Sequence, residues 1–177
     1  LAARGNNEMA LQQYQAAIQQ MIFSFNDTSV FASPSDYSGT FAVIELYETL
    51  LAKAAAFQAL NQKKNKIDYL EAALQTFNSL YQLTDYVEKT YESDEARIFL
   101  NQKRHISHQQ PIEICIRLFQ LTGKNLYLEQ AFFFDERNKA SVLSLGLSDA
   151  ALKKAGNLPA PLVAEEINCK ELINQLS

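Results

Sequence analysis

Residues 111–145, PIEICIRLFQLTGKNLYLEQAFFFDERNKASVLSL, decide the fold of this chain. Apolar residues recur at three- and four-residue steps on both sides of the short segment Thr122-Gly123-Lys124-Asn125. This spacing predicts two helices joined by a turn, because it places the apolar side chains on one face of each helix. We therefore predict a helical hairpin, with Gly123 in the left-handed conformation that ends many helices.

An earlier part of the chain has the same layout. There, Phe57-Gln58-Ala59-Leu60 precedes a polar loop and Tyr69-Leu70-Glu71-Ala72-Ala73, while in the later copy Phe119-Gln120-Leu121 precedes Tyr127-Leu128-Glu129-Gln130-Ala131. Ala73 and Ala131 take equivalent places, where a small side chain lets two helices approach closely. Two imperfect copies of one hairpin predict a stacked array, since a single hairpin cannot bury all its apolar faces. The predicted fold is all-α, with antiparallel hairpins in one domain over residues 1–177.

Other elements follow from capping residues and turn residues. Asn6 or Asn7 is expected to cap a first helix, and Thr40 a second one. Residues 26–40 predict a loop, pinned to the core by Val30, Phe31 and Tyr37. Residues 67–91 give the clearest helical pattern, and further helices are expected after Ser93, after Ser148-Asp149 and from Leu162. The inward positions predicted around Gly123 are Ile112, Cys115, Ile116, Phe119, Leu121, Leu128, Ala131, Phe132 and Phe134.

Charge and hydropathy exclude several classes of partner. The net charge is −4 and no basic stripe is present, so we expect no nucleic-acid partner. Lys63-Lys64-Asn65-Lys66 is interpreted as a solvated loop. No apolar run approaches the roughly 20 residues of a membrane span. Two widely spaced cysteines indicate a reducing compartment, hence a cytoplasmic location. The chain begins at Leu1 without Met, and we interpret it as a piece of a longer protein.

Two pairs of residues are candidates for chemistry. Cys115 or Cys169 could pair with His105 or His108 in a cysteine-nucleophile enzyme, but both cysteines lie in apolar helical patterns, which predicts core packing. The two histidines could share a helix face, yet a zinc site needs three or four ligands. We therefore predict no catalytic residue, no metal and no cofactor.

The run Phe132-Phe133-Phe134 cannot all face one core, because three consecutive helical positions span about 200°. We expect at least one of these rings to mark a partner or interdomain surface. The charges that follow, at Asp135, Glu136, Arg137 and Lys139, are mixed in sign. We interpret them as a solvated helix face with local charge pairs.

The hairpin spacing resembles the tetratricopeptide repeat, in a form without its Trp-x-x-Leu-Gly opening. From about Ala52 onward the chain also resembles the helical repeat region that precedes a CHAT domain, a caspase-like protease module of bacterial multidomain proteins. The most specific likeness is residues 131–140, AFFFDERNKA, where that family shows Ala-Phe-x-Phe-Ala-Glu-x-Ser-Lys-Ala. Asp135 and Asn138 depart from this pattern.

The resemblance implies a right-handed superhelix and a non-catalytic segment that binds a protein or peptide, with a CHAT domain downstream in cis. The catalytic residues of the family belong to that downstream domain, so none is carried over. The expected function is protein–protein interaction through a concave helical surface. The alternative is self-association through the apolar ends of the helical array.

Overall fold

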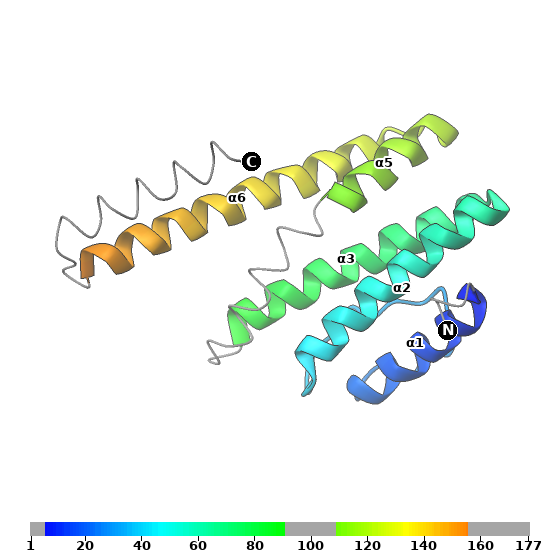
Figure 1. Ribbon diagram of the computed structural model, residues 1–177, viewed down its shortest axis with the longest axis horizontal. Helices are drawn as coiled ribbons and strands as arrows, with labels where there is room; N and C mark the ends of the chain where they lie inside the picture. The colour runs from blue at the N-terminus through cyan, green and yellow to red at the C-terminus, as the bar shows by residue number, and fades with distance from the viewer. Residues whose placement is uncertain (1–5, 91–108, 156–177) are drawn as a thin grey trace. The chain divides into compact units, whose positions relative to one another are not determined.

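The computed structural model describes residues 6–90 and 109–155, with side chains described as far as residue 140. Within these ranges the chain forms helices and no strands, which confirms the all-α class. The helices are α1 (Asn7–Met21), α2 (Val43–Lys64), α3 (Ile67–Thr90), α5 (Gln109–Thr122) and α6 (Leu126–Ala155), shown in Figure 1. The chain divides into two compact units, Leu1–Asn138 and Lys139–Ser177, and the contacts described below lie within the first.

Most predicted helix ends are confirmed where the structure describes them. The side chain of Asn6 accepts a hydrogen bond from the backbone N–H of Met9 (3.3 Å), as a helix cap does. Helix α3 begins at Ile67, as predicted, and Pro111 lies in the first turn of α5. The helices predicted after Ser93 and from Leu162 lie outside the described residues.

Three predicted boundaries are wrong, and one is the start of the loop predicted at Lys63, since α2 continues to Lys64. Thr40 does not cap α2, because its backbone N–H bonds to the carbonyl of Tyr37 (3.1 Å) in a turn, and α2 begins later, after Ala42. The break predicted at Ser148 is absent, since α6 continues without interruption to Ala155. Serine and aspartate favour caps but are tolerated inside a helix, so composition alone did not place this end.

The two hairpins turn by the same backbone geometry. Asn65, which follows α2, and Gly123, which follows α5, both have left-handed φ values, of 49° and 70°. Each donates its N–H to the carbonyl four residues earlier, at 2.7 Å in both turns. These bonds are the left-handed helix termination that satisfies a late carbonyl of the helix. The two turns therefore share one backbone geometry and lie 58 residues apart in the chain.

This spacing corrects one part of the predicted alignment. Phe57 is equivalent to Cys115, not to Phe119, which lies one helical turn later. Both Phe57 and Cys115 are fully buried, whereas Phe119 is only partly covered. The predicted equivalence of Ala73 and Ala131 is confirmed, because both stand eight residues after their left-handed turn residue.

Helix α3 occupies the centre of the packing. It packs on α2 along one side and on α5 along another, while α1 packs on α2 (Figure 1). A first core cluster joins these helices with the start of α6, through Phe57, Phe77, Leu118 and Phe134 among others. A second cluster, around Leu46, Tyr47 and Leu83, lies between α1, α2 and α3 and includes Tyr37.

The predicted inward face of α5 is partly wrong. Ile114, Cys115 and Leu118 are buried, together with Pro111, whereas Ile116 and Leu121 are 42% and 50% exposed. The apolar side of this helix covers more than half of its circumference, with Glu113, Arg117 and Gln120 on the remaining side, so the sequence did not fix which part of that wide face packs on α3.

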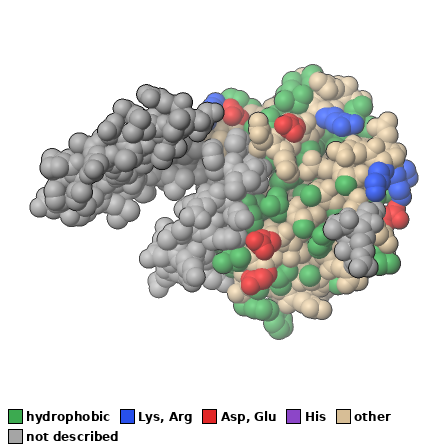
Figure 2. Space-filling model, viewed as in Figure 1, with side chains coloured by type: hydrophobic (Ala, Val, Ile, Leu, Met, Phe, Trp, Pro, Cys, Tyr) green, Lys and Arg blue, Asp and Glu red, His purple; other side chains and the backbone are tan. Residues whose placement is uncertain are grey.

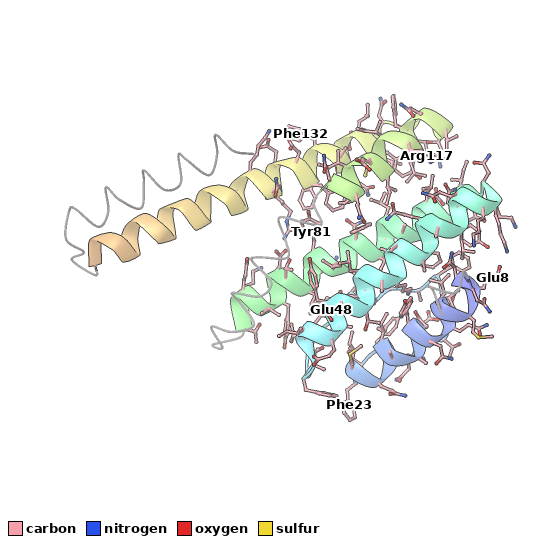
Figure 3. All side chains as sticks on the ribbon, in the orientation of Figure 1. Glu8, Phe23, Glu48, Tyr81, Arg117 and Phe132 are labelled. Carbon is pink, nitrogen blue, oxygen red and sulfur yellow. The ribbon has the colours of Figure 1, made fainter. Side chains whose placement is uncertain are left out.

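The predicted inward face of α6 is partly right, since Phe134 is buried and Ala131 packs, partly buried, against the first core cluster. Tyr127 and Phe134 are buried, while Leu128 is 41% exposed and Phe132 is 66% exposed. Figure 3 shows Phe132 projecting from α6 on the side away from α3. Phe133 is also half exposed, so the expectation that the three phenylalanines cannot share one core is confirmed.

Candidate binding groove

Of the four residues considered for catalysis, the structure describes Cys115. Cys115 is a free thiol, fully buried in the first core cluster, and burial raises the pKa of its thiol to about 12. Its predicted role in core packing is confirmed, because a thiol in this setting is a small apolar group. Cys169, His105 and His108 lie outside the described residues.

Metal and membrane features were also sought in the residues that the structure describes. No group of three or more His, Cys, Asp or Glu side chains gathers in those ranges. No helix there combines the length and hydropathy that crossing a bilayer requires. On the face shown in Figure 2, charged side chains lie singly or in small groups among polar and apolar ones.

Among the described residues, two concave features lie along α3. Two hollows, of about 360 Å³ and 290 Å³, share the lining residues Gln75 and Asn78 and therefore lie next to one another. We call their combined lining the α3 groove. It consists of Ser33, Pro34, Ser35, Glu71, Leu74, Gln75, Asn78, Ser79, Tyr81, Gln82, Leu126, Tyr127, Gln130, Phe133 and Arg137.

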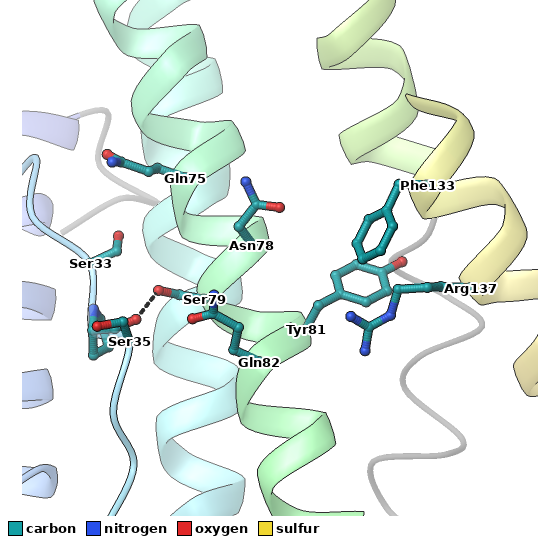
Figure 4. A pocket seen from close by; sticks show the side chains of 10 residues that line it. Ser33, Ser35, Gln75, Asn78, Ser79, Tyr81, Gln82, Phe133 and Arg137 are labelled. Carbon is teal, nitrogen blue, oxygen red and sulfur yellow. Dashed lines mark hydrogen bonds between the residues drawn. The ribbon is translucent and has the colours of Figure 1, made fainter. Parts of the chain in front are cut away.

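The floor of the groove is a polar strip on α3. Glu71, Gln75, Asn78 and Gln82 follow each other at steps of four, three and four residues, which places them on one helix face. The three side-chain amides have no hydrogen bond within the described part of the chain. Figure 4 shows them between the segment carrying Ser33 and Ser35 and the side chains of α6. They offer both donors and acceptors to a ligand.

One wall belongs to the α1–α2 connection, residues 22–42. The hydroxyl of buried Tyr37 donates to the carbonyls of Pro34 (3.1 Å) and Ser79 (2.5 Å), and the Ser79 hydroxyl donates to the Pro34 carbonyl. The predicted role of Tyr37 as a pin is therefore confirmed. Val30 is half buried against the first core cluster, and Phe31 is 43% exposed but stacks on Tyr69 (6.1 Å between ring centroids).

Beneath this wall lies a buried lysine. Lys53 of α2 is fully inaccessible to solvent and donates to the Gln15 side-chain oxygen (2.7 Å) and to the Ala32 carbonyl (2.5 Å). Burial lowers the pKa of Lys53 to about 8, and the negative charge of Asp27 opposes this effect. Gln15 in turn donates to the carbonyl of Asp27 (2.7 Å). These bonds fix residues 27–32 on α1 and α2, and so support the adjoining wall.

The opposite wall belongs to α6. The hydroxyl of Tyr127 donates to the Glu71 carboxylate (2.6 Å), which links α6 to the floor at one end. At the other end Arg137 forms an ion pair with Asp85 of α3. Its guanidinium lies 5.2 Å from the ring centroid of Tyr81 and 5.3 Å from that of Phe133. Figure 3 shows Tyr81 on α3 directed toward α6.

These contacts correct the interpretation of the charges at residues 135–139. Arg137 is not a solvated residue with a local partner, because it is half buried and pairs across to α3. The groove residues of α3 were not predicted as a site. Their only signal in the sequence is the four-three-four spacing of polar residues beside the apolar stripe, which a solvated helix face also shows.

Comparison with models of protein families, with curated proteins and with solved structures finds no match to this chain. The role of the α3 groove is therefore inferred from the residues that line it.

Proposed function

We propose that this chain is a non-catalytic protein-binding module whose α3 groove holds an extended segment of a partner. The observation that carries the proposal is the strip of side-chain amides at Gln75, Asn78 and Gln82, which have no partner within the described residues. An extended polypeptide presents unpaired N–H and C=O groups at regular intervals. Side-chain amides can satisfy both kinds of group.

The dimensions of the groove suit such a ligand. From Glu71 to Gln82 the helix rises about 16 Å, at roughly 1.5 Å per residue. Extended chain covers this length in about five residues. Peptide-binding proteins commonly combine main-chain hydrogen bonds with a pocket for one or two side chains.

A peptide-display experiment tests the proposal. The full chain is panned against random twelve-residue peptides, and recovered peptides are tested against Asn78→Trp, which fills the groove at the point where the hollows meet. Gln13→Trp is the matched control, since Gln13 is exposed on α1 and does not line the groove. We expect binding to be lost with Asn78→Trp and kept with Gln13→Trp. Peptides that bind both variants equally, or no recovered peptides, would contradict the proposal.

The proposal includes the finer expectations about family and fold. The likeness of residues 131–140 to the repeat region preceding a CHAT domain supports a regulatory or scaffold role beside such a domain in a bacterial, cytoplasmic protein. The repeated turns of α2–α3 and α5–α6 support a divergent tetratricopeptide-like array. Their 58-residue spacing is longer than the 34 residues of the usual tetratricopeptide repeat.

A second candidate function is self-association, and one comparison between the hairpins favours it. Leu70 and Leu74 of α3 are buried in the cluster that includes α5. Their equivalents 58 residues later, Leu128 and Phe132 of α6, are exposed. The second hairpin therefore exposes an apolar helix face, whereas the equivalent face of the first hairpin is covered by neighbouring helices.

Light scattering separates the two candidates. Self-association predicts a mass above that of the monomer, reduced to the monomer by Phe132→Glu with little change in thermal stability. A monomer at all concentrations up to about millimolar would eliminate this second candidate and leave the groove proposal intact.

A further inference from the structure

The charges that line the α3 groove differ at its two ends, and this difference bears on which peptide it holds. The inference rests on the proposed function. The charged side chains in the groove lining are Glu71 and Arg137, toward opposite ends of the floor. Their surroundings decide whether each charge is available to a ligand.

At the first end the negative charge of Glu71 is available. Glu71 is exposed and its described hydrogen-bond partner is the neutral hydroxyl of Tyr127. Burial, and then the hydrogen bond and charge of Glu71, raise the pKa of Tyr127 to about 12, so the phenol stays a neutral donor. The carboxylate therefore has a neutral donor and no cationic partner within the described residues, and its other acceptor positions are open to a ligand.

At the second end the positive charge of Arg137 is already balanced. The guanidinium is paired with Asp85 and lies against the rings of Tyr81 and Phe133. Pro34 borders the same hollow, and Phe133 is 51% exposed. This end therefore presents the exposed ring of Phe133 beside polar side chains and carries no net charge, so an aromatic or large aliphatic side chain can pack on that ring.

The distance between the ends fixes the spacing in the ligand. Glu71 and Tyr81 are ten residues apart on α3, a rise of about 15 Å. Extended chain covers that distance in about four residues. We propose that the α3 groove recognises an extended segment with a basic side chain, held at Glu71, about four positions from an aromatic or large aliphatic side chain, held against Phe133.

The test uses peptides recovered from the random twelve-residue display on the full chain. Recovered peptides should share a basic and an aromatic or aliphatic position about four residues apart. A synthetic copy of the most enriched peptide is then titrated by fluorescence anisotropy, in its original form and with its basic residue replaced by glutamine. Glu71→Gln removes the charge but keeps an oxygen that can accept from Tyr127. Glu129→Gln, an exposed change of the same charge outside the groove, is the control.

We expect Glu71→Gln to weaken binding of the original peptide about three- to fivefold, in the range of a partly exposed ion pair. The glutamine peptide should bind both proteins equally, and Glu129→Gln should change neither titration. Groove-dependent peptides without a basic position, or equal losses for both peptides, would overturn this inference and leave the proposed function standing. Absence of any peptide sensitive to Asn78→Trp would overturn both.

Discussion

Lys53 donates a hydrogen bond to Gln15 across the interface of α2 and α1, with 2.7 Å between Nζ and Oε1. A second bond from the same ammonium group reaches the Ala32 carbonyl. Lys53 is fully buried, so these two oxygens must replace the water that a charged amine loses. The buried lysine thus ties the α1–α2 connection to the helices, and this connection forms one wall of the α3 groove.

The first prediction concerns the pH dependence of stability. The pKa of Lys53 is about 8 in the folded chain, below its ordinary value of 10.5. Between these values the unfolded chain binds more protons, so stability rises with pH across this window. From pH 7 to pH 9.5 the gain from Lys53 is about 2 kcal/mol. Urea unfolding at both pH values should show this gain in the wild type relative to Lys53→Met. If the free energy of unfolding changed equally with pH in the two proteins, the lowered pKa of the buried Lys53 would be contradicted.

The second prediction concerns the pin at Tyr37. Tyr37→Phe removes the donor to the Pro34 and Ser79 carbonyls. We expect a loss of about 0.5–1.5 kcal/mol in the free energy of unfolding, because the hydroxyl's bond to α3 is lost while the Pro34 carbonyl keeps the Ser79 hydroxyl as a donor. Groove-dependent peptide binding should also weaken, since Pro34 lines the groove.

Tyr14→Phe serves as the control for Tyr37→Phe. Tyr14 is half buried and has no hydrogen bond within the described residues. The free energy of unfolding of Tyr14→Phe should stay within about 0.5 kcal/mol of the wild-type value. Equal effects of the two substitutions would mean that the Tyr37 hydroxyl does not hold the connection.

The third prediction concerns the paired turns. Gly123 has a φ of 70°, and a Cβ added there meets nothing within 4 Å. Gly123→Ala should therefore cost about 1 kcal/mol from backbone strain alone. Asn65→Gly, at the equivalent turn, should leave stability unchanged or raise it slightly. Thermal melting of both variants checks the pair, and a stabilising Gly123→Ala would refute the shared left-handed turn.

The fourth prediction concerns the equivalent alanines. Ala131 packs against the core and is half buried, whereas Ala73 is fully buried. Ala131→Phe should cost about 1–3 kcal/mol through overpacking, and Ala73→Phe should cost more. Ala55→Phe, on the exposed side of α2, should be near neutral. Denaturant unfolding orders the three variants. A harmless Ala73→Phe would show that the alanines do not set the helix crossing.

Local chemistry explains what the sequence could predict. The cap at Asn6, the turn at Gly123 and the long pattern of α3 depend on residues within a few positions of each other. The inward face of α5 was only partly predicted, because the apolar side of that helix is wider than the face that packs on α3. The burial of Lys53 has no signal in the sequence, because a charged residue beside an apolar stripe is usually solvated.

The candidate groove was less predictable than the helices. Gln75, Asn78 and Gln82 look like an ordinary solvated face, and they become a floor only because the α1–α2 connection and α6 flank them. The ion pair of Arg137 with Asp85 joins residues 52 positions apart. No local pattern encodes a contact of this range.

The most direct test of the groove is to map a bound peptide on the chain by amide chemical shifts. The probe is the display-selected peptide that fails to bind Asn78→Trp. We expect the largest amide shift changes in residues 33–35, 71–82 and 126–137, and small changes on the exposed face of α1 around Gln13. Largest shifts on α1, or on the outer face of α6 around Phe132 with residues 71–82 unchanged, would contradict this expectation.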